Sequence, residues 1–353
     1  YYGGKTQQVE RNTRVKARVK AHALREIIES REHVIIMGHS ISDVDSLGAA
    51  IGIYCAAKVL GKKAQIVLNE ITSSLRPLVE CFTEEKGYPA DLFIKNEEAL
   101  MLTNENTLVV VVDVNRPSYT ECPELLKCTQ TVCVFDHHRQ TNEVIENPVL
   151  SYVEPYSSST CEMIAEVLQY MVDDIKFPAL EAECMYAGIM IDTRNFMSRT
   201  GARTFEAAAF LRRAGADIDR VKQLFIETFD SIQLRAKMVF EASRTEGIAI
   251  SVAPEGLKDM MALAAQSADM LISNEDIEAA FVLYSLNDGG IGVSARSKGK
   301  VNVQVVMEAL GGGGHRTVAG AQLQGMTIEE AKQAILEHAL KALHSAEQEE
   351  EQQ

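Results

Sequence analysis

The sequence contains no CxxC pair, and its seven cysteines are odd in number and scattered along the chain. Zinc sites and disulfide frameworks use paired, regularly spaced cysteines, so neither is expected here. We interpret the cysteines as reduced thiols, mostly in the core of a protein from a cytosolic compartment.

Long apolar segments are also missing. No run approaches the roughly 20 residues that a membrane-spanning helix needs, and no signal peptide is recognisable. The chain starts at Tyr1 without an initiating methionine, so we expect it to be a fragment of a larger protein. The parent chain is therefore free to carry a membrane segment that these residues lack.

Positive charge is scarce, because the formal net charge is −15 at pH 7. A partner such as long duplex DNA requires a broad basic face, so no long nucleic acid is expected. A short or cyclic nucleotide is still allowed, since a bound metal supplies local positive charge. Residues 11–30 have apolar positions at helical spacing with basic residues between them; we interpret them as a solvated lead-in helix, the alternative being a nucleic-acid-binding helix.

With 353 residues and 46% hydrophobic content, the chain is long enough for two domains with real cores. The apolar run that begins at Val34 ends at Gly38, and His39, Asp43 and Asp45 follow before a helical pattern that runs to about residue 60. This is a strand that leads into a loop rich in potential metal ligands, at the sheet edge where α/β proteins bind ligands. The alternative is that Asp45 merely caps the next helix.

Two further apolar runs end in the same way. Residues 108–112 lead into Asp113, and residues 132–135 lead into Asp136, His137 and His138. Continuously apolar strands are typical of a parallel sheet whose two faces are covered by helices. A predicted helix at 179–191 also ends at an acid, Asp192.

The remaining pattern predicts one more strand and several helices in the first two thirds of the chain. The strand is at 64–68, and the helices are at 73–82, 96–102, 157–170, 205–214, 221–229 and 231–242. After about residue 247 the pattern becomes that of an α+β domain of about 100 residues. Its predicted strands are at 248–252, 280–285 and 291–295, with a hairpin turn at 287–290, and helices at 303–310 and 328–343 flank the glycine-rich run 311–315.

We therefore predict an α/β protein with a mainly parallel sheet, joined by a helical linker to a smaller α+β domain. The predicted segments are a lead-in helix with the end of a preceding domain at 1–30, a metal-binding domain at 31–215, the linker at 216–246, a substrate-binding domain at 247–345 and an acidic tail at 346–353.

Carboxylates and imidazoles without cysteine favour a divalent ion such as Mn²⁺, with Mg²⁺, Fe²⁺ and Co²⁺ as alternatives. There are too many candidate ligands for one ion, and two ions about 3.5–4 Å apart form the arrangement that clamps both oxygens in phosphoester hydrolysis. Neighbours on an extended segment point in opposite directions, so one of His137 and His138 can meet a metal while the other faces the substrate. Asp136 is predicted to orient an imidazole by hydrogen bonding to its other ring nitrogen.

Asp136-His137-His138, together with His39-x-x-x-Asp43-x-Asp45, Asp113 and Asp192, resembles the DHH phosphoesterase superfamily. The glycine run that ends at His315, preceded by residues 294–297 and 301–303, resembles the DHHA1 partner domain of that superfamily. Within it, the chain is most similar to the GdpP-type cyclic-di-AMP phosphodiesterases. The stretches that carry this resemblance are residues 2–5, 113–117, 136–139, 147–148 and 154–160.

The resemblance implies two divalent ions, most simply Mn²⁺. One metal would be held by His39, Asp43 and Asp113, and the other by Asp45, Asp113, His137 and Asp192. Asp113 would bridge them, and a water acidified by both cations would attack phosphorus. His138 would contact the scissile phosphate and would stabilise charge or protonate the departing 3′ oxygen.

The glycine run is predicted to bind phosphate. The backbone N–H groups of Gly312, Gly313 and Gly314 would form a nest to which His315 adds a donor, although a flexible loop is the alternative. The resemblance adds Arg296 and Ser297 to this substrate site, and Arg116 from the first domain. Residues 157–160 are open to two interpretations, a helix cap alone or a part of the site.

The predicted reaction is hydrolysis of cyclic di-AMP to linear 5′-pApA. One alternative is the oligoribonuclease and pAp-phosphatase branch of the same superfamily, and another is a non-catalytic cyclic-dinucleotide sensor. We also predict a cytoplasmic location and allow a homodimer as partner. The resemblance implies a parent chain anchored in the cell membrane, with an N-terminal sensor.

Overall fold

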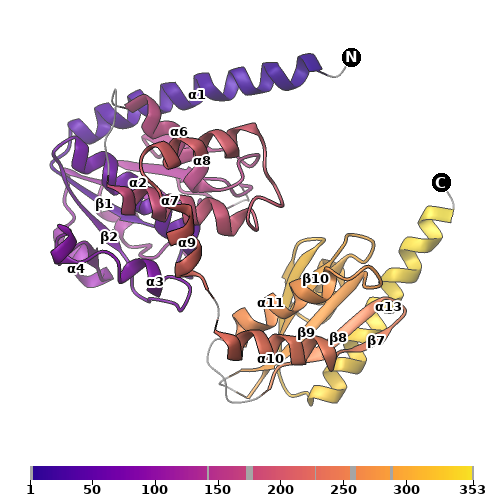
Figure 1. Ribbon diagram of the computed structural model, residues 1–353. Coiled ribbons are helices and arrows are strands. Elements are labelled where there is room, and N and C mark those ends of the chain that lie inside the picture. The colour runs from indigo at the N-terminus through magenta and orange to yellow at the C-terminus, as the bar shows by residue number, and fades with distance from the viewer. Residues whose placement is uncertain are drawn as a thin grey trace. The chain divides into compact units, whose positions relative to one another are not determined.

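A computed structural model describes residues 3–140, 143–171, 178–226, 228–254, 260–286 and 289–351, with side chains from residue 14 to residue 346. The chain divides into two compact units, Tyr1–Ile226 and Glu227–Gln353 (Figure 1). The division lies inside the segment 216–246 that was predicted to be a linker; the predicted domain limits themselves stay predictions. No helix among the described residues is both long and apolar enough to cross a bilayer.

The first unit contains a sheet in which every paired strand runs parallel, in the order β3-β2-β1-β4-β5-β6. The strands are β1 His33–Met37, β2 Lys63–Val67, β3 Phe93–Ile94, β4 Thr107–Val112, β5 Val132–Asp136 and β6 Leu150–Val153. From β1 the chain adds strands toward one edge of the sheet, and from β4 it adds strands toward the other edge. The direction therefore changes between β1 and β4, which are neighbours in the sheet. The mainly parallel sheet predicted from the sequence is confirmed.

Helices cover both faces of this sheet, which is why its central strands are apolar throughout. Along β4, Leu108, Val110 and Val112 belong to one core, and Val109 and Val111 belong to a second core on the other face. The helices are α1 Gly3–Glu29, α2 Val44–Val59, α3 Arg76–Val79, α4 Asn96–Leu102, α5 Leu125–Cys128, α6 Thr160–Met171, α7 Ala179–Asp192, α8 Ala202–Arg213 and α9 Ile218–Leu224, with single 3-10 turns at Glu84–Lys86 and Pro117–Tyr119.

Close contact among α2, α6 and α7 depends on glycine. A Cβ on Gly48 of α2 would lie 2.8 Å from the Cys184 carbonyl oxygen, and a Cβ on Gly188 of α7 would lie 2.4 Å from Cys161 Sγ and 3.1 Å from Asp45 Cα. The three helices therefore pack closely enough to bring the start of α2 against the start of α6.

The second unit is built around a mixed sheet in the order β11-β12-β10-β9-β8-β7, in which only the β8–β9 pair among the described strands is parallel. Its elements are α10 Phe229–Phe240, β7 Ser243–Thr245, β8 Ile248–Val252, α11 Met260–Ile272, β9 Ala279–Ser285, β10 Ile291–Ser297, α12 Val303–Ala309, β11 Gly313–Gly314, β12 Val318–Leu323 and α13 Ile328–Glu351. The predicted α+β character of this unit is confirmed. β9 and β10 pair antiparallel as predicted, but half of the predicted hairpin turn, residues 287 and 288, lies outside the described residues.

Two predicted helices are wrong at their limits. The helix predicted at 73–82 is reduced to α3, because Pro77 has no N–H to donate and favours the first helical turn. The helix predicted at 221–229 ends at Leu224, and Thr228 then caps α10 by accepting a hydrogen bond from Ser231 N at 3.2 Å.

Seven strands and helices of the described chain were not predicted as such. They are the strands β3, β6, β7, β11 and β12 and the helices α5 and α11. β3 and β6 are short and stand at the two edges of the parallel sheet, where periodicity gives little signal.

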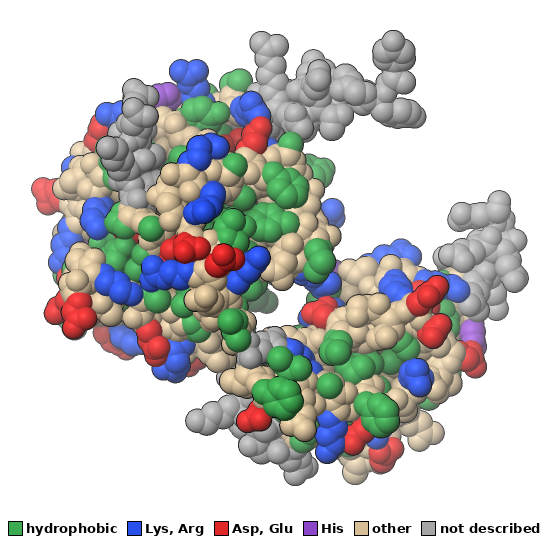
Figure 2. Space-filling view, in the orientation of Figure 1, with side chains coloured by type: hydrophobic (Ala, Val, Ile, Leu, Met, Phe, Trp, Pro, Cys, Tyr) green, Lys and Arg blue, Asp and Glu red, His purple; other side chains and the backbone are tan. Residues whose placement is uncertain are grey.

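Charges of both signs are mixed on the surface. On the face shown in Figure 2, Asp and Glu side chains lie among Lys and Arg side chains in both units. The described side chains drawn there form no continuous basic patch.

Candidate metal centre

The candidate ligands gather at the carboxyl ends of three neighbouring strands. β4 pairs with β1 on one side and with β5 on the other, so the segments that follow these strands leave the sheet at the same edge. Asp113 follows β4, His39 lies two residues after β1, and His137 follows β5. The parallel arrangement alone therefore brings together residues that are almost 100 positions apart.

Asp113 lies at the centre of the cluster and is 2% exposed. Its Oδ2 is 3.4 Å from His39 Nε2, and its Oδ1 is 3.5 Å from His137 Nε2. Its φ of 61° is in the left-handed region, which Asp tolerates better than most residues but which still costs free energy. This conformation turns the carboxylate toward both histidines.

The first group of candidate ligands combines His39, Asp43 and Asp113. His39 Nε2 lies 3.5 Å from Asp43 Oδ2, while Asp43 Oδ1 accepts a hydrogen bond from Ser46 N at 3.0 Å. Asp43, and not Asp45, is thus the N-cap of α2, so the alternative role considered for Asp45 is wrong. Capping leaves one oxygen of Asp43 directed at the histidine.

The second group combines Asp45, His137 and Asp192. His137 Nε2 is 3.9 Å from Asp45 Oδ2 and 3.4 Å from Asp192 Oδ2. Asp45 is buried in the first turn of α2, and Asp192 is the last residue of α7. Directly after α7, Arg194, Asn195 and Phe196 all have positive φ, which makes a tight left-handed turn behind the ligand.

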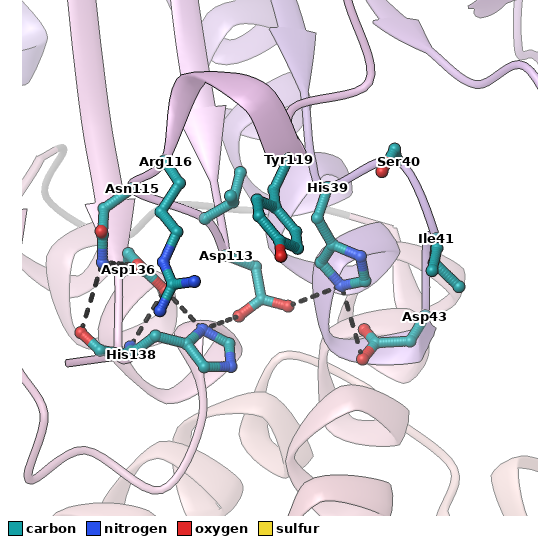
Figure 3. Close-up of a pocket in the computed structure, with 11 residues that line it drawn as sticks. His39, Ser40, Ile41, Asp43, Asp113, Asn115, Arg116, Tyr119, Asp136 and His138 are labelled. Atoms are coloured by element: carbon teal, nitrogen blue, oxygen red, sulfur yellow. Dashed lines mark hydrogen bonds and ion pairs between the residues drawn. The ribbon is translucent and has the colours of Figure 1, made fainter. Parts of the chain in front are cut away.

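His138 faces the same cluster from a more open position, with 59% of its side chain exposed. Its Nδ1 lies 2.8 Å from Asp136 Oδ1, and Asp136 is entirely buried. Asn115 Nδ2 donates to the other oxygen of Asp136 and, at 3.4 Å, to the His138 carbonyl. Figure 3 shows these contacts as one chain from Asn115 through His138, Asp113 and His39 to Asp43.

Crowded negative charge perturbs the titration of the cluster. Burial and the charge of Asp45 raise the pKa of Asp113 well above its usual range, and burial with the same neighbour raises the pKa of Asp192 to about 8. Burial disfavours the charged form of His39, but hydrogen bonds to Asp113 and Asp43 outweigh it and raise its pKa to about 10. Burial lowers the pKa of His137 and so favours its neutral form.

The donor set fits divalent cations. Within each of three groups, one ligand atom per residue lies within 4.8 Å of the others, and the groups are His39-Asp43-Asp113, Asp45-His137-Asp192 and Asp113-His137-His138. All donors are carboxylate oxygens or imidazole nitrogens, which suit hard and borderline divalent ions. Positive charge there would relieve the repulsion among the buried carboxylates. All six predicted metal ligands are thus brought together.

A pocket of about 330 Å³ opens beside the first group. It is lined by His39, Asp43, Asp113, Asp136, His138 and the predicted substrate residue Arg116, and also by Asn115, Tyr119 and Ile41. Asn115, Tyr119 and Ile41 were not predicted to be site residues. The Arg116 guanidinium lies over the Tyr119 ring, 5.4 Å from its centroid. Both residues follow Asp113 within six positions, and this closeness in the sequence could have identified Tyr119 as a site residue.

The predicted substrate residues of the second unit lie on or near β10 and β11. Arg296 Nε donates to Asp269 Oδ1 at 3.0 Å, and Ser297 is buried with its Oγ donating to the Arg316 carbonyl at 3.3 Å. Arg296 therefore already has an acidic partner, which a phosphate would have to displace or share.

The glycine run does not form the expected open nest. Gly311 N donates to Glu308 O, Gly312 N donates to Met307 O and His315 N donates to Val318 O, at 3.1, 2.7 and 2.7 Å. Gly313 and Gly314 form β11 and pair with β12, where a Cβ on Gly314 would lie 2.5 Å from Ala319 Cα. In this conformation the glycines therefore serve close backbone pairing, and the His315 side chain remains exposed.

Two family descriptions match the chain. The DHH family N-terminal domain matches residues 33–189, and the DHHA1 domain matches residues 249–345. The first match covers five of the six candidate metal ligands, and only Asp192 lies outside it. The second match covers the glycine run. A solved structure of an exopolyphosphatase-related protein from Bacteroides fragilis has the same fold, with a TM-score of 0.80 over 93% of this chain and 98% of that chain, at 18% identity.

Two relatives are similar over nearly the whole chain. The cyclic-di-AMP phosphodiesterase GdpP of Geobacillus thermodenitrificans is 45% identical over 341 residues, which are 96% of this chain and 52% of the relative. GdpP of Bacillus subtilis is 43% identical over 347 residues, with the same two shares of 96% and 52%. The chain thus spans about half the length of these relatives.

Proposed function

Because the chain belongs to the DHH family, whose members are metal-dependent phosphoesterases, we propose that it hydrolyses cyclic di-AMP to linear 5′-pApA. The relatives that share 43–45% of its residues carry the name of this activity. The family likeness supports phosphoester chemistry, and the named relatives support the cyclic dinucleotide as substrate.

One observation carries the proposal. The Asp113 carboxylate lies between two groups of candidate ligands, with Oδ2 facing His39 at 3.4 Å and Oδ1 facing His137 at 3.5 Å. A carboxylate shared in this way is what a two-metal phosphoesterase requires. We assign one ion to His39, Asp43 and Asp113, and a second to Asp45, Asp113, His137 and Asp192, with Mn²⁺ as the proposed ion.

Bound divalent ions would supply Lewis acidity toward the phosphate and would lower the pKa of water. The remaining work belongs to the chain. His138 is the proposed proton donor to the departing 3′ oxygen, because Asp136 holds its Nδ1 and leaves Nε2 for the substrate. Asn115 fixes Asp136 in turn, so the ring is oriented before the substrate arrives.

The pocket supplies contacts for the rest of a nucleotide. Tyr119 is 54% exposed, and Ile41 is 69% exposed, at the pocket wall. An aromatic ring backed by a guanidinium is suited to stack on a purine, while Arg116 is also suited to a phosphate. We propose that the second unit adds Arg296, Ser297, Gly312, Gly313, Gly314 and His315 as further substrate contacts, after rearrangement of the glycine run.

The experiment that tests this function compares four substrates in the presence of Mn²⁺: cyclic di-AMP, cyclic di-GMP, pApA and pAp, with products separated by chromatography. Fast conversion of cyclic di-AMP to pApA with little AMP is expected. Faster turnover of pApA or pAp would instead place the chain with the oligoribonucleases and pAp phosphatases. Binding of cyclic di-AMP without any turnover would identify a sensor.

The predicted homodimer, the cytoplasmic location and the membrane-anchored parent chain with a sensor are part of the proposal. The relatives are about twice as long as this chain, which is compatible with further domains. Light scattering of the purified chain tests the dimer directly.

A further inference from the structure

Four consecutive hydroxyl residues, Ser157 to Thr160, lead into α6 immediately behind the metal cluster. We call residues 157–160 the Ser/Thr turn. They are between 0% and 5% exposed, and the Glu162 carboxylate beside them is 2% exposed. Buried hydroxyls are costly unless they are hydrogen-bonded, so their partners show what the turn is for.

Helix capping accounts for only one of these hydroxyls. Ser159 Oγ accepts a hydrogen bond from Glu162 N at 3.0 Å, which is the ordinary N-cap contact. Ser157 and Ser158 donate to Glu162 at 3.2 and 2.5 Å, and Thr160 donates to Asp113 Oδ1 at 2.9 Å. The other three hydroxyls are therefore committed to carboxylates.

Thr160 contacts both buried acids of the metal cluster. Its backbone N donates to Asp45 Oδ2 at 2.6 Å while its hydroxyl holds Asp113, and Cys161 N donates to Asp45 Oδ1 at 2.9 Å. The positive end of the α6 dipole thus faces Asp45. One residue fixes the relative orientation of carboxylates from two different elements.

The same turn selects the tautomer of His137. His137 Nδ1 lies 3.4 Å from the Ser157 carbonyl oxygen, which can only accept a hydrogen bond. The proton is thereby placed on Nδ1, and the Nε2 lone pair is left to face Asp113, Asp45 and Asp192. This is the tautomer that a metal-binding imidazole needs at Nε2.

Glu162 anchors the turn to a separate helix. Besides Ser157 and Ser158, its carboxylate accepts a hydrogen bond from Thr204 Oγ1 of α8 at 2.7 Å, and Arg203 Nε lies 3.9 Å away. The position of the turn is therefore set by α8 as well as by α6.

We propose that Ser157, Ser158 and Thr160 of the Ser/Thr turn, locked by Glu162, position the metal centre. Thr160 orients Asp113 and Asp45, and Ser157 orients His137, whereas Ser159 only caps α6. The inference depends on the proposed function, because it assigns these residues a role toward the proposed Mn²⁺ ligands. None of the four residues of the turn is among the proposed ligands; they contact Asp113, Asp45 and His137 instead.

The test measures Mn²⁺ binding by the 353-residue chain, using electron paramagnetic resonance to distinguish free from bound ion. Thr160→Val keeps the shape and the backbone N–H but removes the hydroxyl, and it is expected to weaken Mn²⁺ binding about 10- to 100-fold. Thr160→Ser restores the hydroxyl and is expected to bind like the wild type. Ser159→Ala is the matched control, expected to lower the melting temperature through loss of the cap without changing Mn²⁺ affinity.

Wild-type Mn²⁺ affinity in a folded Thr160→Val variant would overturn the inference. Equal losses of Mn²⁺ affinity in Thr160→Val and Ser159→Ala would also overturn it, since they would indicate a purely structural role. If Thr160→Val does not fold, Ser157→Ala provides the decision. It keeps the carbonyl that faces His137 but removes the hydroxyl that ties this residue to Glu162, so weaker Mn²⁺ binding and an altered spectrum of the bound ion are expected. No change would count against the inference. Failure of the proposed function is distinguishable, because it would appear in the wild type itself, as no turnover of cyclic di-AMP or no binding of Mn²⁺, whereas failure of this inference appears only in the comparison of the variants.

Discussion

Asp113 is the single residue whose loss should matter most. Asp113→Asn keeps the size of the side chain but removes the charge that faces both histidines. We expect turnover of cyclic di-AMP to fall by about three orders of magnitude or more, because a metal clamp contributes several kcal/mol and each 1.4 kcal/mol is a factor of ten. Steady-state kinetics at saturating Mn²⁺ measures this.

Asp91→Asn is the matched control for that variant. Asp91 belongs to the same unit and pairs with Lys63 at 2.9 Å on the surface, far from the strand ends that carry the ligands. Its turnover should stay at the wild-type level. Near-normal turnover in Asp113→Asn would eliminate the shared-carboxylate arrangement.

The adjacent histidines give a second prediction, because burial separates their roles. His137 is 8% exposed and faces three acids, whereas His138 has a largely exposed side chain held by Asp136. His137→Ala should weaken Mn²⁺ binding strongly. His138→Ala should retain Mn²⁺ binding and lower kcat by about 10²-fold or more, as loss of a general acid does.

Calorimetric titration with Mn²⁺ and single-turnover kinetics separate these two effects. If both variants lost Mn²⁺ in equal measure, His138 would be a metal ligand rather than a proton donor. That outcome would indicate that the third group of candidate ligands, Asp113-His137-His138, binds one of the ions.

The sequence predicted the candidate ligands but not the residues that hold them in place. Strand ends that carry acids and histidines pointed to five of the six metal-ligand candidates, because parallel strands bring their carboxyl ends to one edge. The sixth candidate, Asp192, ends a helix. Asn115 and Thr160 carry no such pattern. Their roles depend on contacts between β4, β5 and α6, and these follow from tertiary packing, which a single sequence does not reveal.

Among the secondary-structure elements, the contact of α7 with α6 and α2 leaves no room for a side chain at Gly188. A Cβ at Gly188 would lie 2.4 Å from Cys161 Sγ. Gly188→Ala should therefore destabilise the fold by about 1–2 kcal/mol, because overpacking outweighs the better helix propensity of alanine. Adding Cys161→Ala should recover most of this loss.

Chemical denaturation of the two single variants and the double variant completes a cycle that isolates the coupling. Additive effects would contradict the close contact between α6 and α7. Because the same Cβ would approach Asp45 Cα at 3.1 Å, Mn²⁺ affinity should fall along with stability in Gly188→Ala.

Glu181, in the first turn of α7, predicts a pH dependence of stability that is unrelated to the metal site. It is entirely buried, with Lys58 Nζ 3.7 Å from its carboxylate, and burial raises its pKa above the usual value. A carboxyl with a raised pKa in the folded state contributes stability when it is protonated, and this contribution is lost as pH rises through the folded-state pKa.

Glu181→Gln should remove that loss. We expect the melting temperature of the variant, relative to that of the wild type in the same buffer series, to increase as pH rises above the ordinary glutamate pKa of about 4.5. A margin that shrinks with rising pH would show that the Lys58 pair, and not desolvation, controls this carboxyl.

Element prediction succeeded where the chain has a strong period. The central strands and the long helices other than α11 were found from apolar runs and helical spacing, because burial leaves a clear pattern. Failures occurred at α3, where Pro77 fixes the helix start, and at the junction of α9 with α10, where Thr228 is a cap inside an apolar stretch.

The whole molecule has two units, each with its own cores. The described apolar side chains of the first unit form separate clusters from those of the second, so each unit has the means to fold alone. All six proposed metal ligands belong to the first unit, whereas Arg296 and the glycine run belong to the second.

Separate expression of residues 1–226 tests this division of roles. The fragment should melt cooperatively and bind Mn²⁺ with the affinity of the full chain, since no proposed ligand is removed. Its affinity for cyclic di-AMP should fall by at least about tenfold, because the loss of even one charged phosphate contact costs about 1.5–3 kcal/mol.

Isothermal titration of the fragment and of the full chain gives the affinity for Mn²⁺. The affinity for cyclic di-AMP is measured by the same method on versions of both proteins that carry Asp113→Asn, so that the substrate is not hydrolysed. In the full chain, Arg296→Ala should reproduce part of the loss, and Lys341→Ala on the exposed side of α13 should not. Unchanged affinity in the fragment would mean that the first unit holds the dinucleotide alone, with Arg116 and Tyr119 supplying the contacts that we assign to the second unit.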